Sequence, residues 1–525
     1  MPIGFLKKDG IPKNIIKDFM ILSRYTLKNI SPETVDIPGE RTLELPEKVL
    51  QFGTGVLLRG LPDYFINKAN QKGIFNGRIV VVKSTSKGNS SAFEKQDGLY
   101  TLCVRGLQNG KKVEENIINA SVNRVLSANE DWEQILECAH NKDMQVIISN
   151  TTEVGIQLVN DDIRRHPPVS FPGKLLAFLY ERYKAFNASE QSGMVIIPAE
   201  LISDNGKILE SIVLELAHLN GLEETFIEWL ECCNHFCNSL VDRIVTGKPA
   251  AEIQEELENE LGYKDELLIM SEAYRLWAIE GDKKIKDILS FAEADGGVII
   301  EENIEMHKEL KLRLLNGTHT LSCGLAFLAG CDTVKQAMDD EIISSYISNV
   351  MQNEIAPAIP YNVDLNIARD FGAKVLDRFR NPHINHQWIN ITVQLSSKMK
   401  MRCVPLLLRH YKTNDNPPEL MALGFAAYLY FMKAVKEEKG KFYGELNGEK
   451  YLIQDDAAEI FMKRWKTLKP AEVVRDVLRD NAFWGESLNI LPGFQIAVTE
   501  KLSLLMNNGA KEAIEFIQSK KEFAA

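Results

Sequence analysis

The stretch Val49-Leu-Gln-Phe-Gly-Thr-Gly-Val-Leu-Leu-Arg-Gly60 decides the fold. Its first four residues are a short β-type run, Gly53-Thr-Gly55 is a turn, and from Val56 to Lys72 apolar residues recur at helical spacing. In such a unit the first glycine permits a tight turn, the second lets a ligand approach the backbone, and the helix N-terminus presents free N–H groups to a pyrophosphate. The stretch therefore predicts a dinucleotide site, with contacts from Phe52, Gly53, Thr54, Gly55, Val56, Leu57, Leu58 and Arg59.

The dinucleotide motif is incomplete. Leu58 stands where the third glycine would be, and the next apolar run ends in Lys83-Ser-Thr-Ser-Lys87, without the carboxylate that usually holds the adenosine ribose. We expect the hydroxyls of Ser84 and Thr85 to make that contact. NAD is the expected cofactor, and NADP is not excluded, because no acidic residue would repel a 2′-phosphate. An ordinary turn between a strand and a helix is the alternative to a nucleotide site.

Further apolar runs extend the pattern. Arg78–Val82, Gln145–Ile148 and Met194–Pro198 are typical of buried strands, and the helical segments between them predict a mainly parallel sheet. Beyond Ile208 long helical patterns dominate, and only Gly297–Ile300 looks like a strand. The helices are expected at residues 208–219, 224–245, 318–328, 340–350, 367–378, 420–436 and 470–480.

The fold class predicted from these patterns is an α/β N-terminal Rossmann-like domain followed by a mostly α-helical C-terminal domain. Residues 1–45, which are rich in proline, form an N-terminal extension packed on the body. Residues 46–265 form the dinucleotide-binding domain. Residues 266–525 form a helical substrate domain, with the active site at the interface.

Composition limits the function classes. The chain has 525 residues, too many for one core, and 45% of them are hydrophobic, which excludes a disordered protein. Its net charge of -12 argues against a nucleic-acid partner. Neither a signal peptide nor a membrane span is recognisable, and eight cysteines without regular spacing suit a reducing compartment. We expect a cytoplasmic protein with a small-molecule substrate; the oligomeric state is left open.

A second stretch carries candidate chemistry: Lys311-Leu-Arg-Leu-Leu-Asn316-Gly-Thr-His319. On an ideal α-helix the lysine, histidine and asparagine fall at roughly 0°, 80° and 140°, on one side of the helix and beside leucines. A lysine desolvated there would lose its proton more readily and act as a general acid or base. The alternative is an ordinary helix end followed by a loop.

Metal chemistry is not expected. Cys232-Cys-Asn-His-Phe-Cys237 contains ligand types, but only Cys233 and Cys237 would share a helix face. His383 and His386 are too few for a site. We therefore predict structural cysteines and no metal.

Four ordered motifs identify a family resemblance. Val49–Gly60, Asp97-Gly-Leu-Tyr-Thr101, Val241-Asp-Arg-Ile244 and Lys311-x4-Asn316-x2-His319 resemble the polyol-specific, mannitol-dehydrogenase-like long-chain dehydrogenases. Three segments resemble more closely the members of this family that act on hexuronates: Pro198–Gly206, Leu240–Gly247 and Leu314–His319. The resemblance spans about residues 45–480.

The resemblance implies roles by position. Lys311 corresponds to the proton donor or acceptor, and Asn316 and Asn205 to two amides that stabilise the reacting oxygen. His319 corresponds to a residue that orients the substrate. Asp242 and Arg243, together with Lys398 of Ser396-Ser-Lys398, are expected at the substrate.

The chain departs from its polyol-oxidising relatives at two places. It has Glu200-Leu-Ile before its Asn-Gly pair, and Asn390 where they place an arginine. A sugar acid also needs a cation for its carboxylate, for which Arg243, Arg59, Lys398 and Arg402 are candidates. A hexitol dehydrogenase, another hexuronate reductase, a decarboxylating hydroxyacid dehydrogenase and a catalytically silent nucleotide-binding protein are the alternatives.

Overall fold

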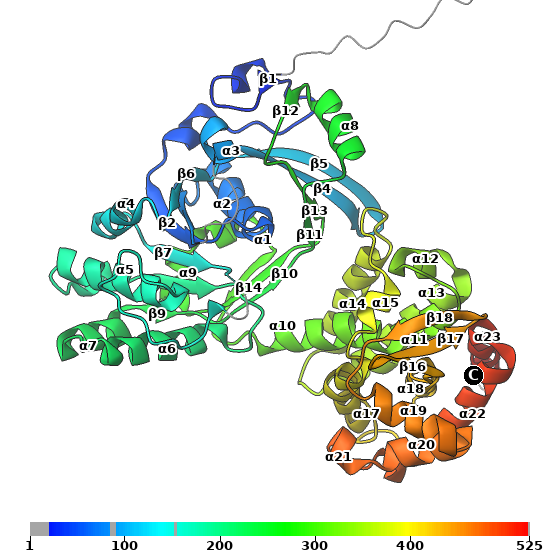
Figure 1. Ribbon diagram of the computed structural model, residues 1–525. Helices are drawn as coiled ribbons and strands as arrows, with labels where there is room; N and C mark the ends of the chain where they lie inside the picture. The colour runs from blue at the N-terminus through cyan, green and yellow to red at the C-terminus, as the bar shows by residue number, and fades with distance from the viewer. Residues whose placement is uncertain (1–19, 85–90, 152–154, 523–525) are drawn as a thin grey trace, which may run out of the picture.

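The computed structural model describes residues 20–84, 91–151 and 155–522. Figure 1 shows two lobes, an N-terminal one built around sheets and a C-terminal one built almost entirely of helices. The predicted fold class is thereby confirmed. Thr85 and residues 1–19 of the predicted extension lie outside the described residues.

A six-stranded parallel sheet forms the centre of the N-terminal lobe. Its strand order is β6-β3-β2-β7-β8-β9. Four of its members are the predicted runs, whereas β6 and β9 were not predicted. The strands are β2 (Glu47–Phe52), β3 (Arg78–Lys83), β6 (Val122–Ser127), β7 (Val146–Ser149), β8 (Val195–Pro198) and β9 (His235–Phe236).

Each face of this sheet is covered, because alternate residues along a strand point to opposite sides. Leu50 and Phe52 enter a core with α5 (Phe171–Ala185), α6 (Asn205–Leu219) and α7 (Glu224–Cys233). Val49, Ile79 and Val81 enter a second core with α1 (Val56–Gly60) and α2 (Pro62–Gln71). Burial on both faces explains why these strands are continuous apolar runs.

Two smaller sheets extend the N-terminal lobe beyond the predicted boundary at residue 265. One has the order β11-β13-β4-β5 and the other β10-β14-β15. The single helix predicted over residues 224–245 was wrong beyond Cys233, where the chain forms β9, β10 and β11. The strands are β4 (Tyr100–Gln108), β5 (Lys111–Asn119), β10 (Ser239–Asp242), β11 (Val245–Gly247), β13 (Ile269–Glu272), β14 (Leu276–Glu280) and β15 (Val298–Glu301).

The described part of the N-terminal extension packs on this lobe. β1 (Met20–Ile21) pairs in parallel with β12 (Tyr263–Lys264). Leu22 and Leu27 are buried in a core with Tyr263.

One large hydrophobic core unites the C-terminal lobe. Its predicted helices are present with ends shifted by one or two residues, except that the helix predicted over 420–436 ends at Phe431 and Lys436 begins a strand. A short antiparallel sheet of β16 (Lys436–Glu438), β17 (Lys441–Leu446) and β18 (Glu449–Ile453) was not predicted. The predicted helices appear as α11 (Thr318–Leu328), α13 (Glu341–Asn349), α14 (Leu365–Phe379), α18 (Glu419–Phe431) and α20 (Pro470–Arg479).

The helix that enters the C-terminal lobe contains a wide turn. After α10 (Glu305–Leu310) it continues as a π-helix, η7 (Lys311–Gly317), and then becomes α11. A second π-helix, η10 (Met399–Cys403), packs beside η7. Such turns often occur at functional sites.

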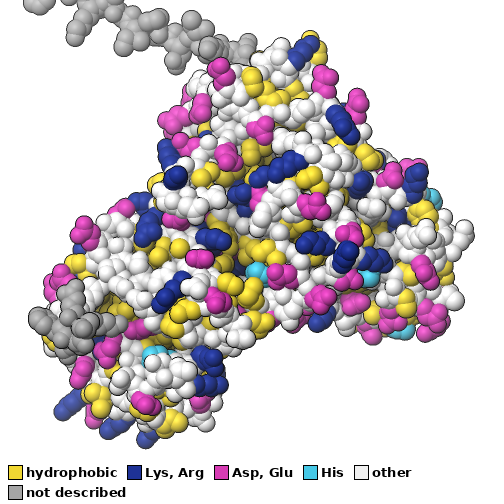
Figure 2. Space-filling model, turned by 180° about the vertical axis from the view of Figure 1, so that it is seen from behind, with side chains coloured by type: hydrophobic (Ala, Val, Ile, Leu, Met, Phe, Trp, Pro, Cys, Tyr) yellow, Lys and Arg dark blue, Asp and Glu magenta, His cyan; other side chains and the backbone are white. Residues whose placement is uncertain are grey.

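The surface carries mixed charges. On the face shown in Figure 2, lysine and arginine side chains are interspersed with aspartate and glutamate rather than gathered into one basic stripe. Within the described ranges, no helix combines the length and apolar character that a membrane crossing requires.

Candidate active site

A cavity of about 220 Å³ lies where the two lobes meet. From the N-terminal lobe it receives Asp242 and Ile244, and the helical lobe supplies the rest. The structure thus brings together four residues predicted for the site from distant parts of the chain. The lining residues are Asp242, Ile244, Lys311, Leu315, Asn316, His319, Val334, Arg378, Phe379, Ile384 and His386.

The π-helix aligns two of these residues. On an α-helix Lys311 and Asn316 would be roughly 140° apart. In a π-turn the backbone bonds residue i to residue i+5, so these two positions lie about one full turn apart. The wide turn therefore places the ammonium and the amide on the same side, closer together than an α-helix predicts.

Lys311 is fixed against the N-terminal lobe. Its Nζ donates a 2.9 Å hydrogen bond to the carbonyl of Val241 on β10. The next residue, Asp242, is buried, which by itself would raise the pKa of its carboxyl. Arg378 and then Lys311 outweigh burial and lower that pKa, so Asp242 is an anion beside the lysine.

His319 is a neutral imidazole in the cavity wall. Burial, followed by His386 and nearby cations, lowers its pKa well below the ordinary range. Its ring stacks on Phe379 at 4.2 Å between centroids and meets His386 edge-on. Among the described residues its buried Nε2 has no hydrogen-bond partner. A neutral ring with one open nitrogen suits a hydroxyl of a bound ligand.

Arg378 is the residue of this cavity that sequence reasoning missed. It is the second-to-last residue of α14 and binds two carboxylates of the N-terminal lobe, Asp242 and Glu272. Neither lies near it in the sequence, so no local motif marks the cluster. The signal available in the sequence was an arginine at helical spacing from the apolar residues Phe371 and Val375.

Asn205 does not line the cavity. Its amide Nδ2 donates to the carbonyls of Pro198, Glu200 and Ser239 at 3.0–3.1 Å, and its Oδ1 accepts from the Ser239 N–H. A Cβ on Gly206 would stand 2.5 Å from the Cys237 carbonyl carbon, which explains the glycine. In this arrangement the Asn-Gly pair joins α6 to β10, and the amide hydrogens are committed to carbonyls.

The two positions where the chain departs from polyol-oxidising relatives also lie off the cavity lining. Glu200 is buried and accepts hydrogen bonds from the Ser149 hydroxyl and the Thr151 N–H, which joins the ends of β7 and β8. Asn390 is exposed. Neither departure therefore contacts the cavity in this arrangement.

The four candidate cations separate into two groups. Arg59 and Arg243 donate to backbone carbonyls of the N-terminal lobe and lie over aromatic rings. Lys398 and Arg402 belong to the helical lobe, and both contribute to the lowered pKa of His319. None of the four lines the cavity, but Arg402 donates to Thr320, the neighbour of the lining residue His319.

Lys398 and Arg402 are two nearby cations that retain unused hydrogen-bond donors. Lys398 Nζ donates to the Ile391 carbonyl at 2.9 Å, and Arg402 donates to the Thr320 hydroxyl at 3.2 Å. The Arg402 Nε is buried without a hydrogen-bond partner among the described residues. Burial lowers the pKa of both groups, and Arg402 lowers that of Lys398 further. An anion between them would relieve this mutual repulsion.

The glycine turn follows β2 and begins α1. Gly53 has a φ of 127°, and a Cβ there would approach Asn150 O and Leu58 Cδ1 to 3.0 Å, so only glycine fits. Gly55, the exposed N-cap of α1, would place a Cβ in open space. The turn thus leaves the backbone N–H groups of a helix end accessible from outside.

Among the other predicted cofactor residues, Ser84 is available for a contact, whereas the side chains of Phe52 and Leu58 are not. The buried Ser84 hydroxyl, at the end of β3, has no partner among the described residues, as a ribose contact requires. Phe52 and Leu58 are fully buried, so their side chains belong to the core. The open glycine turn and the unpaired hydroxyl fit a dinucleotide lying across the carboxyl ends of β2 and β3.

A buried carboxyl, Asp63, lies at the start of α2, the helix that follows α1. Tyr100 donates to the Arg59 carbonyl and to Asp63, at 2.8 and 3.3 Å. Burial raises the pKa of Asp63 to about 7, although Arg59 and the hydrogen bonds oppose the rise. The Asp63 Oδ1 has no partner among the described residues.

The cysteines and histidines considered for metal chemistry do not form a site. Cys232 is exposed and Cys237 is buried, and all eight cysteines are free thiols. His386 lines the cavity, whereas His383 does not. Within the described ranges no three His, Cys, Asp or Glu side chains are grouped so that they could hold a metal ion.

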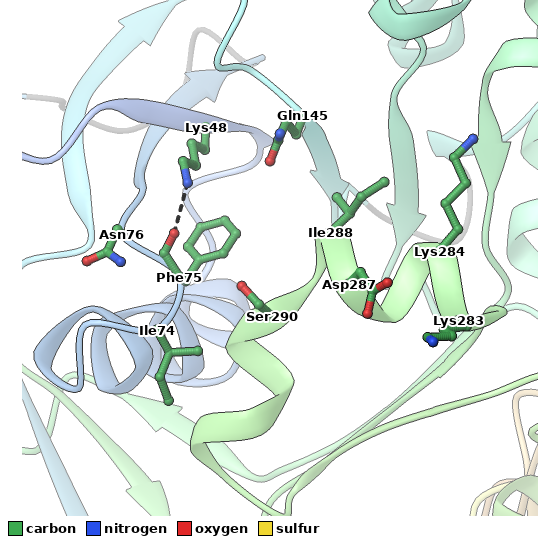
Figure 3. A pocket seen from close by; sticks show the side chains of 10 residues that line it. All are labelled: Lys48, Ile74, Phe75, Asn76, Gln145, Lys283, Lys284, Asp287, Ile288 and Ser290. Carbon is green, nitrogen blue, oxygen red and sulfur yellow. Dashed lines mark hydrogen bonds between the residues drawn. The ribbon is translucent and has the colours of Figure 1, made fainter.

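A second hollow, of about 670 Å³, lies at the opposite edge of the central sheet. Figure 3 shows Lys48, Phe75, Gln145 and Asp287 around it, with Lys48 bonded to the Phe75 carbonyl. Lys48, Phe75 and Gln145 precede or begin strands of this sheet, and Asp287 belongs to α9 (Lys283–Ile288). Ligands of open α/β sheets bind at the other edge, so the interdomain cavity is the better candidate.

The fold and the site define a two-domain dehydrogenase, with a Rossmann domain for the cofactor and a helical domain that supplies the lysine. Residues 47–290 match the mannitol dehydrogenase Rossmann domain and residues 303–506 match the mannitol dehydrogenase C-terminal domain. The chain therefore belongs to the mannitol dehydrogenase family.

Curated relatives cover most of the chain. An altronate oxidoreductase of Halalkalibacterium halodurans is 35% identical over 484 residues, covering 90% of this chain and 94% of the relative. An altronate oxidoreductase of Escherichia coli O7:K1 is 36% identical over 492 residues, covering 91% and 98%.

Solved structures share the fold. Mannitol 2-dehydrogenase of Pseudomonas fluorescens, a ternary complex with NAD and D-mannitol, has a TM-score of 0.65 at 21% identity and covers 95% of this chain and 100% of its own. A substrate-free D-sorbitol dehydrogenase has a TM-score of 0.72 at 20% identity, with coverage of 94% and 100%.

Proposed function

We propose that this protein is an NAD-dependent oxidoreductase that interconverts D-tagaturonate and D-altronate in hexuronate catabolism. The observation that carries the proposal is the convergence of Lys311, Asn316 and the neutral His319 on one interdomain cavity. Relatives named altronate oxidoreductase, matched over about nine tenths of the chain, support the substrate.

Proton transfer belongs to Lys311. NADH, when bound over Gly53–Gly55, supplies the hydride that reduces the ketone carbon. Lys311 as an ammonium donates a proton to the ketone oxygen, and as a free amine it takes that proton back during oxidation. Its bond to the Val241 carbonyl keeps the side chain directed along the cavity wall.

Asn316 and His319 complete the chemistry. The Asn316 side chain lines the cavity next to Lys311, where an amide N–H stabilises the negative charge that develops on the oxygen. The open Nε2 of His319 binds a substrate hydroxyl, which fixes the carbon chain relative to the lysine. For Asn205 to contact the same oxygen, its amide would have to give up a hydrogen bond to one of the carbonyls that it binds.

The carboxylate of the sugar acid is assigned to Lys398 and Arg402. These two cations lie beside His319, and no ion pair with a carboxylate joins either of them within the described ranges. Arg59 and Arg243 are engaged with the backbone of the other lobe. A carboxylate at this end would orient the substrate with its keto group toward Lys311.

One assay tests the proposal. Purified protein is mixed with NADH or NADPH and with tagaturonate, fructuronate or fructose, and cofactor oxidation is followed. We expect the highest kcat/KM with tagaturonate and NADH. A preference for fructuronate or fructose would assign the protein to another activity of the family. The absence of turnover with every pair would refute the dehydrogenase proposal.

A further inference from the structure

Arg378 joins two buried carboxylates from the opposite lobe. Its NH1 and NH2 donate to Asp242 at 2.8 and 2.9 Å, and its Nε and NH2 donate to Glu272 at 3.0 and 2.8 Å. The exposed fractions of the three side chains are 4% for Arg378, 7% for Asp242 and 1% for Glu272. The cluster lies at the cavity wall and spans the domain boundary.

Protein groups take up most of the hydrogen-bonding capacity of Arg378. Four hydrogen bonds to carboxylates engage all but one of its five N–H donors, and the group also lies 4.3 Å from the centre of the Tyr274 ring. A substrate carboxylate could make two hydrogen bonds to it only by displacing one of two buried partners. Arg378 is therefore poorly suited to bind substrate directly, although it lines the cavity.

Asp242 has two cations within reach. Lys311 bonds to the carbonyl of the preceding residue, Val241, and both Lys311 and Arg378 favour the ionised form of the aspartate. A lysine that formed its own ion pair with Asp242 would hold its proton more tightly. The planar fork of Arg378, bonded to both carboxylate oxygens, competes with that pairing.

We propose that Arg378 is a positioning residue that binds Asp242 and thereby keeps its carboxylate from capturing Lys311. This inference rests on the proposed function, in which Lys311 must give up and regain a proton in each cycle. Glu272 holds the other side of Arg378 and also accepts the Ile244 N–H at 2.6 Å, which fixes the fork in place.

Other titratable groups also lie near Lys311. Burial lowers the pKa of His386, as it does that of His319, so both imidazoles are neutral. Lys398 and Arg402 do not line the cavity, whose charged residues besides Lys311 are Asp242 and Arg378. On the helix of Lys311 itself, Lys308 pairs with Glu305 and Arg313 pairs with Glu309. Asp242 is therefore the carboxylate of the cavity lining that Lys311 could pair with, and Glu272 binds Arg378 from its other side.

Two substitutions should shift the pH dependence in opposite directions. Arg378→Leu frees Asp242 to pair with Lys311, so the pH at which altronate oxidation rises should move up by about one unit or more. Asp242→Asn removes the anion and leaves Arg378 bound to Glu272, so the same midpoint should move down. Arg378→Lys keeps the charge but not the fork, and its midpoint should lie between wild type and Arg378→Leu.

The experiment uses two readouts on the full chain. The first is the pH dependence of kcat for altronate oxidation. The second, which needs no substrate, is the pH dependence of Lys311 acetylation by acetic anhydride, followed by peptide mass spectrometry. Arg464→Leu is the matched control, because Arg464 bridges Asp476 and Asp480 at 2.8 and 2.6 Å away from the cavity. Its midpoints should equal those of wild type.

Opposite shifts in both readouts support the proposal. Midpoints of Arg378→Leu and Asp242→Asn that stay at the wild-type value, or move in the same direction, overturn it. If wild type does not oxidise altronate, the proposed function fails, and the acetylation midpoints still decide the role of Arg378. Should Arg378→Leu not fold, Asp242→Asn and Arg378→Lys carry the same comparison.

Discussion

Replacing Asp63 by asparagine should stabilise the protein in neutral and alkaline solution. Asp63 is fully buried on α2, behind the glycine turn, and burial raises the pKa of its carboxyl from 3.8 to about 7. Each unit of pKa difference between the folded and unfolded states corresponds to about 1.36 kcal/mol. Ionising this carboxyl therefore reduces the free energy of unfolding by roughly 4 kcal/mol.

The sign follows from the raised pKa. The folded state holds its proton more tightly than the unfolded state, so this contribution to stability is complete below about pH 4 and is lost as the pH rises through about 7. Asparagine does not titrate. The advantage of Asp63→Asn over wild type should grow between about pH 4 and pH 7 and then stay constant.

Urea denaturation across this pH range measures the effect. Asp295→Asn is the matched control, because Arg275 and Lys68 overcome burial and lower the pKa of Asp295 to about 2. Its contribution is present above the unfolded value near 4 and is lost only as the pH falls through about 2, so its difference from wild type should be flat. A flat difference for Asp63→Asn as well would refute the reasoning.

Substitutions at four further positions test the site. Lys311→Met should lower kcat by roughly 10²–10⁴-fold, the usual contribution of a general acid or base, while NADH affinity measured by fluorescence stays near wild type. Gly53→Ala should lower the melting temperature, because φ is 127° and the new Cβ meets Asn150 O, whereas Gly55→Ala should leave the melting temperature unchanged and weaken NADH binding. Arg402→Met should raise KM for altronate at least tenfold, with the exposed Arg409→Met as the control; an unchanged KM would exclude Arg402 as the carboxylate partner.

The central strands could be predicted from the sequence because both faces of the sheet are buried. Ile79–Val82 is apolar throughout, short and rich in β-branched residues, and this combination is typical of a strand buried on both faces. β10, Ser239–Asp242, mixes polar and apolar residues over four positions, too few to establish a period. The preceding helical pattern was therefore extended through it.

The candidate site was only partly predictable. Lys311, Asn316 and His319 lie close together in the sequence, so their motif identified them. Arg378 acts through Asp242 and Glu272, which are 136 and 106 residues away, and only the folded chain brings them together. The environment of Asn205 depends likewise on carbonyls from three separate segments.

The wide turn at Lys311–Gly317 lets one helix meet two requirements, which are packing into the core and alignment of Lys311 with Asn316. Leu310 and Leu321, at either side, belong to the same hydrophobic core, so the flanking segments have fixed orientations. The π-turn accommodates one residue more than a regular helix would hold between them. Deleting a single leucine there would let a regular helix form with its core contacts intact, but it would rotate Lys311 away from Asn316. The length of this segment, as much as the identity of its residues, encodes the geometry of the candidate site.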